Sequence, residues 1–354
     1  MPARRISIAD IASQLRLSPS TVSRALAHNP DVSEATRQRV QELAQTLGYQ
    51  PNQVAVALRK GHSNTLGVLV PHLSGTFFPE VVDGITEAAS QAGYNVMICQ
   101  SREDAGQERK NLELLMNAPV AGLLVSLAST TQDYAPFEAV RTASLPLVFF
   151  DRAIEGLTGQ GISSVVIDDY AGAYMAVTHL AEQGCRRIAH FSGPLHLAIY
   201  EQRHRGYLQA LRDQQLPYDP TLVLPTQPSQ ADGAVGMHQL LQLPHPPDAV
   251  FSSSDLTLVG ALQVLKEQGR RVPDDVALAG FSNAEFTALT EPPLTTVDQH
   301  SHQMGREAVQ QLLRMLHADA PAPAVVLRPQ LLVRASSQRG EQAPRRPAAQ
   351  AARS

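Results

Sequence analysis

The first 50 residues place hydrophobic positions at helical spacing and separate them with polar breaks. Between residues 8 and 15, apolar side chains recur at the i, i+3, i+4, i+7 spacing that gives a helix one apolar face. A second helix is predicted to start after Ser18, whose side chain can cap it, with Pro19 in its first turn. Ser33 is the predicted cap of a third helix, and Gly48 is predicted to end it. The segment is therefore expected to form three short helices.

From Thr65 onward the pattern changes to short apolar runs that alternate with helix-length amphipathic stretches. This alternation predicts βαβ units and parallel sheets covered on both faces. The number of runs exceeds one ordinary sheet, so we expect two doubly wound lobes. The runs lie at 66–70, 94–99, 121–127, 145–150, 163–168, 187–192, 248–253 and 276–281.

Charge is distributed unevenly along the chain, whose net charge is −4. The first 62 residues carry eight Lys or Arg and four Asp or Glu, a net charge of +4, so the rest carries −8. A small basic segment on an acidic body indicates a nucleic-acid-binding module joined to another domain. Two cysteines, no apolar run of about 18 residues and no apolar signal-peptide region favour a reducing cytoplasm and no membrane partner.

The sequence gives little support for catalysis. The glycine patterns that cradle nucleotides are absent, and so is the H-E-x-x-H zinc pattern. Residues 280–284 resemble a damaged G-x-S-x-G nucleophile turn, but no triad can be assigned around it. His300 and His302 lack a third metal ligand, and polar loop histidines explain them better. We expect no enzyme activity, no catalytic residue, no metal and no cofactor.

The first two predicted helices are joined by a three-residue break, 16–18, which is the spacing of a helix-turn-helix. Short hydroxyl side chains and one arginine face away from the apolar side of the second helix, where they suit base edges and phosphates in a major groove. The alternative is an ordinary three-helix bundle.

Three segments together resemble the lactose/purine-repressor (LacI/GalR) family of transcription regulators. They are ISIADIASQLRLSPSTVSRALAHNPDVSEATRQRVQELAQTLGYQPNQVAVALRKG (6–61), LGVLVPHLSGTFFPEVVDGI (66–85) and VPDDVALAGFSNAEFTALTEPPLTTVDQ (272–299). The resemblance runs from Ile6 to about Arg334. It implies an all-α helix-turn-helix head and an α/β periplasmic-binding-protein-like sensor of two doubly wound lobes. It also implies a homodimer that binds double-stranded operator DNA and holds a small-molecule effector between the lobes.

The resemblance also implies which residues meet DNA. Ser20 and Arg24 fall, together with Pro19, where the family reads bases, and proline is a poor base reader. In the hinge, Leu58 matches a leucine that wedges into the minor groove, although dimer packing is an alternative role. The full implied set is Ser18, Pro19, Ser20, Thr21, Ser23, Arg24, Asn29, Asn52, Val54, Ala55 and Leu58.

In the sensor, the resemblance places Arg203 where a guanidinium hydrogen-bonds the effector. Where many relatives carry Asn-Asp this chain has Ser254-Asp255, and Ser282-Asn283 stands where an aspartate often grips sugar hydroxyls. A neutral pair there favours an acidic or phosphorylated ligand, or Asn283 replaces the grip and the ligand is a sugar. The full implied set is Phe77, Phe78, Asp151, Arg203, Ser254, Asp255, Ser282, Asn283 and Gln299. One of the two phenylalanines can instead be core.

We expect a repressor of carbohydrate-utilisation genes whose effector is a sugar, sugar acid or sugar phosphate. The alternative is a solute-binding protein without operator specificity. The expected organisation is a head (1–50), a hinge helix and linker (51–64), a sensor (65–338) and a disordered tail (339–354). Within the sensor, we expect lobe 1 to span about 65–160 plus 299–318, and lobe 2 about 161–298 plus 319–338.

Overall fold

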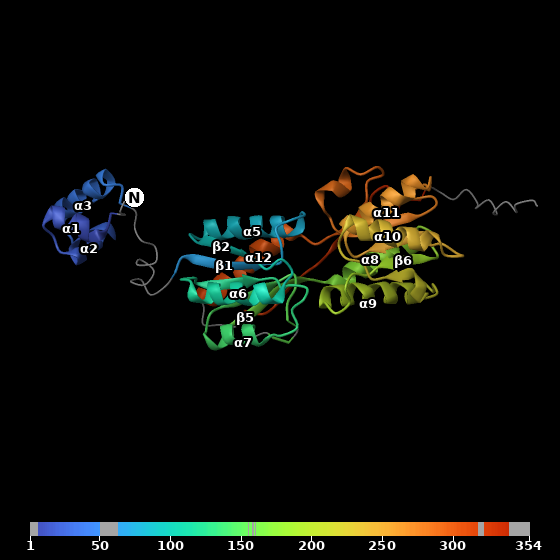
Figure 1. Ribbon diagram of the computed structural model, residues 1–354, viewed down its shortest axis with the longest axis horizontal. Helices are drawn as coiled ribbons and strands as arrows, with labels where there is room; N and C mark the ends of the chain where they lie inside the picture. Colours follow the sequence, from blue (N-terminus) through green and yellow to red (C-terminus); the bar gives the residue numbers. More distant parts are fainter. Residues whose placement is uncertain are drawn as a thin grey trace, which may run out of the picture. The chain divides into compact units, whose positions relative to one another are not determined.

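The computed structural model describes residues 6–49, 63–154, 156–157, 159, 161–317 and 322–339. The chain divides into two compact units, Met1–Ser63 and Asn64–Ser354 (Figure 1). The expected hinge helix and nearly all of the expected tail lie outside the described residues.

The N-terminal unit contains the three predicted helices: α1 (Ile8–Leu15), α2 (Pro19–Leu26) and α3 (Glu34–Thr46). Ser18 caps α2, because its side chain accepts a hydrogen bond from the Thr21 N–H. Gly48 follows α3 with φ +64°, a conformation that glycine adopts without steric cost. The small core is made of Ile11, Ala12, Val22, Ala25, Val32, Val40 and Ala44.

The second unit begins with a six-stranded parallel sheet in the order β11-β5-β4-β3-β1-β2. Figure 1 shows helices on both of its faces, and two separate apolar clusters flank the sheet. Its strands are β1 (Thr65–Val70), β2 (Asn95–Gln100), β3 (Gly122–Val125), β4 (Leu147–Phe150), β5 (Ile162–Ile167) and β11 (Val325–Leu327). Its helices are α5 (Phe77–Gln91), α6 (Ala105–Asn117), α7 (Ala135–Thr142) and α12 (Ser301–His317).

The other lobe is a six-stranded sheet in the order β12-β10-β9-β8-β6-β7, parallel except for β12. Its strands are β6 (Ile188–Phe191), β7 (Val223–Leu224), β8 (Ala249–Ser252), β9 (Ala277–Ser282), β10 (Thr295–Asp298) and β12 (Gln330–Leu332). Its helices are α8 (Asp169–Glu182), α9 (Ala198–Asp213), α10 (Gln230–Leu241) and α11 (Asp255–Glu267), with short 3₁₀ turns η1 (Pro220–Leu222) and η2 (Glu285–Ala288). No helix of the described residues is long and apolar enough to cross a membrane.

The expected boundary between the lobes was wrong. The run 163–168 was assigned to lobe 2, yet β5 pairs with β4 and with β11 in the first sheet. The chain therefore passes between the lobes after β5, after β10 and between β11 and β12. Pairing partners decide where a strand belongs, and an apolar run does not reveal its partner.

Candidate functional site

One surface of the N-terminal unit carries the residues expected to meet DNA. Ser18, Pro19 and Ser20 are exposed at the start of α2 and Arg24 is exposed in its last turn, while Val22 and Ala25 on the opposite side are buried. The hydroxyl of Ser18 lies 2.8 Å from those of both Ser20 and Thr21. The helix thus presents a cluster of hydroxyls and one exposed guanidinium.

The remaining residues of that expected set divide into two groups. Thr21, Ser23 and Asn29 are partly buried, and Asn29 supports a turn because its side-chain oxygen accepts from the Asp31 N–H. The hinge residues Asn52, Val54, Ala55 and Leu58 lie outside the described residues.

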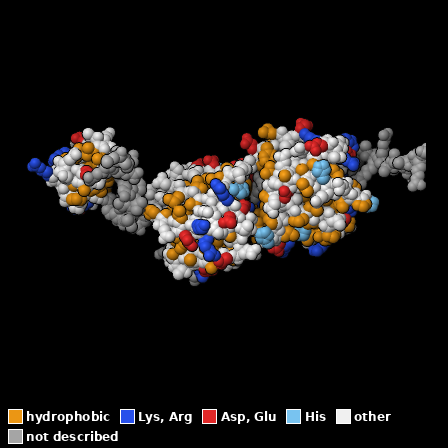
Figure 2. All heavy atoms as spheres, in the orientation of Figure 1, with side chains coloured by type: hydrophobic (Ala, Val, Ile, Leu, Met, Phe, Trp, Pro, Cys, Tyr) orange, Lys and Arg blue, Asp and Glu red, His pale blue; other side chains and the backbone are white. Residues whose placement is uncertain are grey.

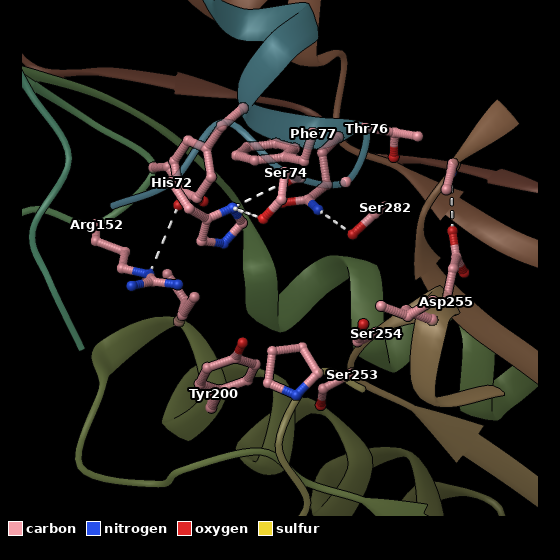
Figure 3. A pocket seen from close by; sticks show the side chains of 18 of the residues that line it. His72, Ser74, Thr76, Phe77, Arg152, Tyr200, Ser253, Ser254, Asp255 and Ser282 are labelled. Atoms are coloured by element: carbon pink, nitrogen blue, oxygen red, sulfur yellow. Dashed lines mark hydrogen bonds and ion pairs between the residues drawn. The ribbon is translucent and has the colours of Figure 1, made fainter. Parts of the chain in front are cut away.

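A cavity of about 170 Å³ lies between the two lobes of the second unit. Figure 3 shows His72, Phe77 and Arg152 of lobe 1 on one side, and Tyr200, Ser253 and Ser254 of lobe 2 on the other. Loops after parallel strands and the starts of helices supply this lining, as is usual for ligand sites in open α/β sheets. The volume is below the range of about 300–1,000 Å³ typical of drug-sized ligands, so it suits one small ring.

Most of the expected effector residues line this cavity. They are Phe77, Phe78, Asp151, Arg203, Ser254, Asp255, Ser282 and Gln299. Phe78 also belongs to the core of lobe 1 and is almost fully buried, so it combines the two alternative roles. Phe77 is partly buried and meets Phe78 edge-on.

Asn283 was expected to contact the effector, but it is not among the residues that line the cavity. Its amide nitrogen donates to Asp298 and its carbonyl accepts from Arg334, so both ends are used away from the cavity. Ser282 lines the cavity instead, with a backbone φ of 126° that strains the turn. Its hydroxyl accepts a hydrogen bond from Gln299.

Arg203 is held rigidly by lobe 2 and by a segment that passes between the lobes. Its Nε donates to Asp169 at 2.7 Å, Nη1 to the Ser253 carbonyl at 2.8 Å and Nη2 to Gln299 at 3.2 Å. The guanidinium lies 3.8 Å from the centre of the Phe281 ring. Because Asp169 already balances its charge, Arg203 offers directed N–H groups rather than free positive charge.

Sequence reasoning missed a second buried arginine, Arg152, which follows β4 and is only 8% exposed. Its Nη1 bonds both oxygens of Glu103, at 2.8 and 3.0 Å, and also the Leu127 carbonyl. The Arg152 charge lowers the pKa of Glu103, although burial alone would raise it. The sequence does show an Asp151-Arg152 pair directly after the apolar strand β4, but the prediction included only Asp151. His72, Tyr200 and Phe286 also line the cavity and were missed.

Asp255 lines the cavity, but both oxygens of its carboxylate accept hydrogen bonds from other residues of lobe 2. One oxygen accepts from the Thr296 hydroxyl at 2.7 Å and the other from the Ala284 N–H at 2.9 Å. A Cβ at Gly280 would lie only 2.1 Å from the Asp255 carboxylate, so glycine is required there. Asp255 thus positions the turn that carries Ser282.

Burial raises the pKa of Asp255 to about 6 from the ordinary 3.8. The folded state therefore holds this proton more tightly, and the stability contributed by Asp255 falls as pH rises from about 4 to about 6. The loss at neutral pH is about 3 kcal/mol of unfolding free energy. The unfolding free energy, measured with urea, should differ less between pH 4.5 and pH 7 for Asp255→Asn than for the wild type. Asp83→Asn changes an exposed carboxylate and should keep the wild-type change in unfolding free energy between the two pH values. If Asp255→Asn also keeps the wild-type change, Asp255 does not have the raised pKa.

The candidate enzyme features do not converge. The turn at Ser282 binds Gln299, and no histidine–carboxylate pair contacts its hydroxyl among the described residues. His300 lies near Asp298, whereas His302 lies near Asp83 and Glu87.

Comparisons with known proteins agree with this geometry. Residues 7–52 match the model for "Bacterial regulatory proteins, lacI family", and 177–337 match the "Periplasmic binding protein-like domain". The transcriptional repressor CytR of Escherichia coli is 36% identical over 304 residues, 86% of this chain and 88% of that protein. The ribose operon repressor of Halalkalibacterium halodurans is 31% identical over 311 residues, 88% of this chain and 90% of that protein.

Solved structures show the same arrangement. A lac repressor dimer bound to operator and the anti-inducer ONPF has a TM-score of 0.84 and 26% identity, over 94% of this chain and 99% of that one. The CelR–cellobiose complex has a TM-score of 0.71 and 31% identity, over 94% of this chain and 100% of that one.

A helix-turn-helix unit followed by two α/β lobes is the architecture of DNA-binding transcription regulators that carry a periplasmic-binding-protein-like domain. The chain belongs to the LacI family of bacterial regulatory proteins and is a transcriptional repressor by family. Its relatives are repressors rather than enzymes, which is consistent with a regulator that catalyses no reaction.

Proposed function

We propose that this protein represses carbohydrate-utilisation genes by binding a near-palindromic operator as a homodimer. The head (1–50) reads the operator, the hinge (51–64) joins it to the sensor, and Leu58 wedges into the minor groove. A neutral, hydroxyl-bearing ring compound such as a sugar binds in the cavity between the lobes and changes operator affinity. The two-lobed relative solved with cellobiose supports an effector of this class.

The single observation that carries the effector class is the pairing of both arginines at the cavity. Arg203 is paired with Asp169, and Arg152 is paired with Glu103. Asp151 adds a buried carboxylate at the same cavity, and burial raises its pKa. A phosphate or carboxylate ligand would meet no unbalanced positive charge here, whereas sugar hydroxyls can both donate to carboxylates and accept from guanidinium groups. The preference for an acidic ligand, drawn from the sequence, is therefore replaced by a neutral one.

Exposed apolar side chains on the second unit support the dimer. The edge strand β2 exposes Met97 and Ile98, at 37% and 39% of their surface. Lobe 2 exposes Val235 and Leu289 in the same way. Figure 2 shows hydrophobic side chains at the surface of both lobes on the face in view. Burial of such surface between two copies is the usual driving force for a homodimer.

The proposal is tested by operator selection followed by titration with neutral sugars. Selection from random duplex DNA should return a near-palindromic site, and one of the single-ring sugars D-ribose, D-glucose or D-galactose should change the affinity for it. Sugar phosphates should act more weakly than the parent sugars. A protein that binds all duplex sequences equally would point to the solute-binding alternative.

Arg24→Ala is expected to weaken operator binding by about 1–3 kcal/mol and to flatten base preference at one position of each half-site. The reason is that Arg24 is the exposed guanidinium of α2 and proline at position 19 cannot read a base edge. Arg39→Ala, an exposed arginine on α3, serves as the matched control for charge alone. Gel-shift titrations on operator and unrelated DNA measure both effects. Equal losses on the two DNAs would mean that Arg24 touches only phosphate.

A further inference from the structure

The residue that follows α1, Arg16, has a backbone conformation that favours glycine. Its φ of 52° and ψ of 44° lie in the left-handed region. The Leu17 N–H donates to the Ala12 carbonyl at 3.0 Å and the Arg16 N–H to the Ser13 carbonyl at 3.4 Å, which is a Schellman helix ending. A residue with a Cβ adopts the left-handed conformation at a steric cost that glycine avoids.

Glycine serves at the same kind of helix ending elsewhere in the chain. In the same N-terminal unit, Gly48 has this place after α3, where the Tyr49 N–H donates to the Ala44 carbonyl. Among the described residues, the left-handed position of such an ending is held by Gly48, Gly93, Gly184 and Gly269, or by Arg16, His28, Ser144 and Gln215. The geometry of the ending therefore does not require an arginine.

The Arg16 side chain has no partner within the fold. It is exposed, and no described residue forms a hydrogen bond or an ion pair with its guanidinium. Arg37 of α3 differs, because its Nη1 donates to Glu34 at 2.6 Å and its Nη2 donates to two backbone carbonyls. The Arg16 charge lies at the carboxyl end of α1, where a cation is favourable, so stabilisation of that helix end is the alternative role.

Arg16 lies two residues before Ser18, which begins the hydroxyl cluster at the start of α2. Leu17 between them packs against the apolar core of the unit, and Arg16 and Ser18 are both exposed. The first turn of α2 contains no acidic residue. The free N–H groups at the start of a helix and a nearby guanidinium both favour an anion, and duplex DNA presents phosphates.

We propose that Arg16 contacts a DNA phosphate beside α2. Arg16 is outside the set of residues expected to meet DNA. The inference deepens the proposed operator binding and rests on it in one respect, namely that the head binds duplex DNA. A phosphate contact strengthens binding to every sequence alike, so Arg16 contributes affinity, and base readout is left to Ser20 and Arg24.

Arg16→Gly tests the proposal because strain and charge have opposite effects. Glycine relieves the strain, so the head should unfold at the same or a higher urea concentration than in the wild type, while the loss of charge weakens DNA binding. The chain contains no tryptophan, so Tyr49→Trp, introduced into every full-length protein compared, reports on unfolding of the head. The selected operator and an unrelated duplex of equal length are titrated by fluorescence anisotropy at several salt concentrations.

Arg16→Gly should weaken binding to both duplexes about fivefold to tenfold per head at about 0.1 M salt. The slope of log affinity against log salt concentration should become shallower by about 0.9 per head. Arg16→Gln keeps the strain but loses the charge and should bind like Arg16→Gly, whereas Arg16→Lys should bind like the wild type. Arg39→Gln removes an exposed charge from α3 and is the matched control for the net charge of the head, so it should change the slope less.

Unchanged affinity and unchanged salt dependence in Arg16→Gly would overturn the proposal. An equal slope change in Arg39→Gln would also overturn it, because Arg16 would then act only through net charge. Equal losses in Arg16→Gly and Arg16→Lys, with a head that unfolds at lower urea, would show that Arg16 is a structural residue at the end of α1. A wild type without preference for the selected operator would contradict the proposed function instead, and the unrelated duplex would still measure the Arg16 contact.

Discussion

Replacing Arg203 by alanine is expected to lower effector affinity by about 2–5 kcal/mol, roughly 30-fold to several thousand-fold. Arg203 lines the effector cavity at 3% exposure, and its planar fork is fixed by Asp169, Ser253 and Gln299. Its loss removes charge-assisted hydrogen bonds from a dehydrated site. Calorimetric titration with the neutral sugar that alters wild-type operator binding measures the effect. The variant should keep its ligand-free operator behaviour, because the head does not contain Arg203.

The same substitution leaves the Asp169 carboxylate buried without its partner, which costs about 3–5 kcal/mol of unfolding free energy. Arg203→Lys separates the two effects. An ammonium retains the charge beside Asp169 but cannot reproduce the fork, so this variant should unfold near the wild-type urea concentration and still bind effector poorly. If Arg203→Lys binds effector normally, the arginine acts as a structural cation and not as an effector contact.

Local sequence patterns predicted the positions of the strands far better than they predicted which strands pair with each other. The eight apolar runs correspond to β1–β6, β8 and β9, because buried parallel strands are continuous stretches of apolar residues. The two-residue β7 and the three-residue β11 and β12 are too short to show a pattern. Whether β5 belongs to the first or the second sheet depends on pairing with β4 and β11, which no window of sequence contains.

Residues of the effector cavity were predictable where they lie at or just after the carboxyl end of a strand, as Asp151, Ser254 and Ser282 do. Orientation was not predictable. Asn283 sits next to Ser282 yet turns to Asp298 and Arg334, and this follows from the strained turn. The net charge at the cavity was also not predictable from the sequence, because Arg152 pairs with Glu103, which lies 49 residues earlier in the chain. Charge at a site is a property of pairs, and the pairs form only in the fold.

Gly305→Ala is expected to destabilise the second unit by about 3 kcal/mol, although alanine normally favours a helix. Gly305 of α12 lies against α5, and a Cβ there would meet the Val81 carbonyl oxygen at 2.0 Å and the Ile85 nitrogen at 2.9 Å. Because both contacts are backbone, the two helices would have to separate. The same α5 begins with Phe77 and Phe78, and α12 begins two residues after Gln299, so separation of the helices would also displace residues that line the effector cavity.

Urea unfolding and calorimetric titration of Gly305→Ala should therefore show lower stability together with weaker effector binding. Gly106→Ala is the matched control, because Gly106 lies exposed in α6 and its added Cβ would approach only the Asp104 side chain. That variant should be neutral or gain up to about 1 kcal/mol, since glycine is the poorer helix former. A Gly305→Ala protein as stable as Gly106→Ala would show that α5 and α12 do not pack backbone to backbone. Gly305→Ala that lost stability but bound effector normally would show that the crossing does not position the cavity walls.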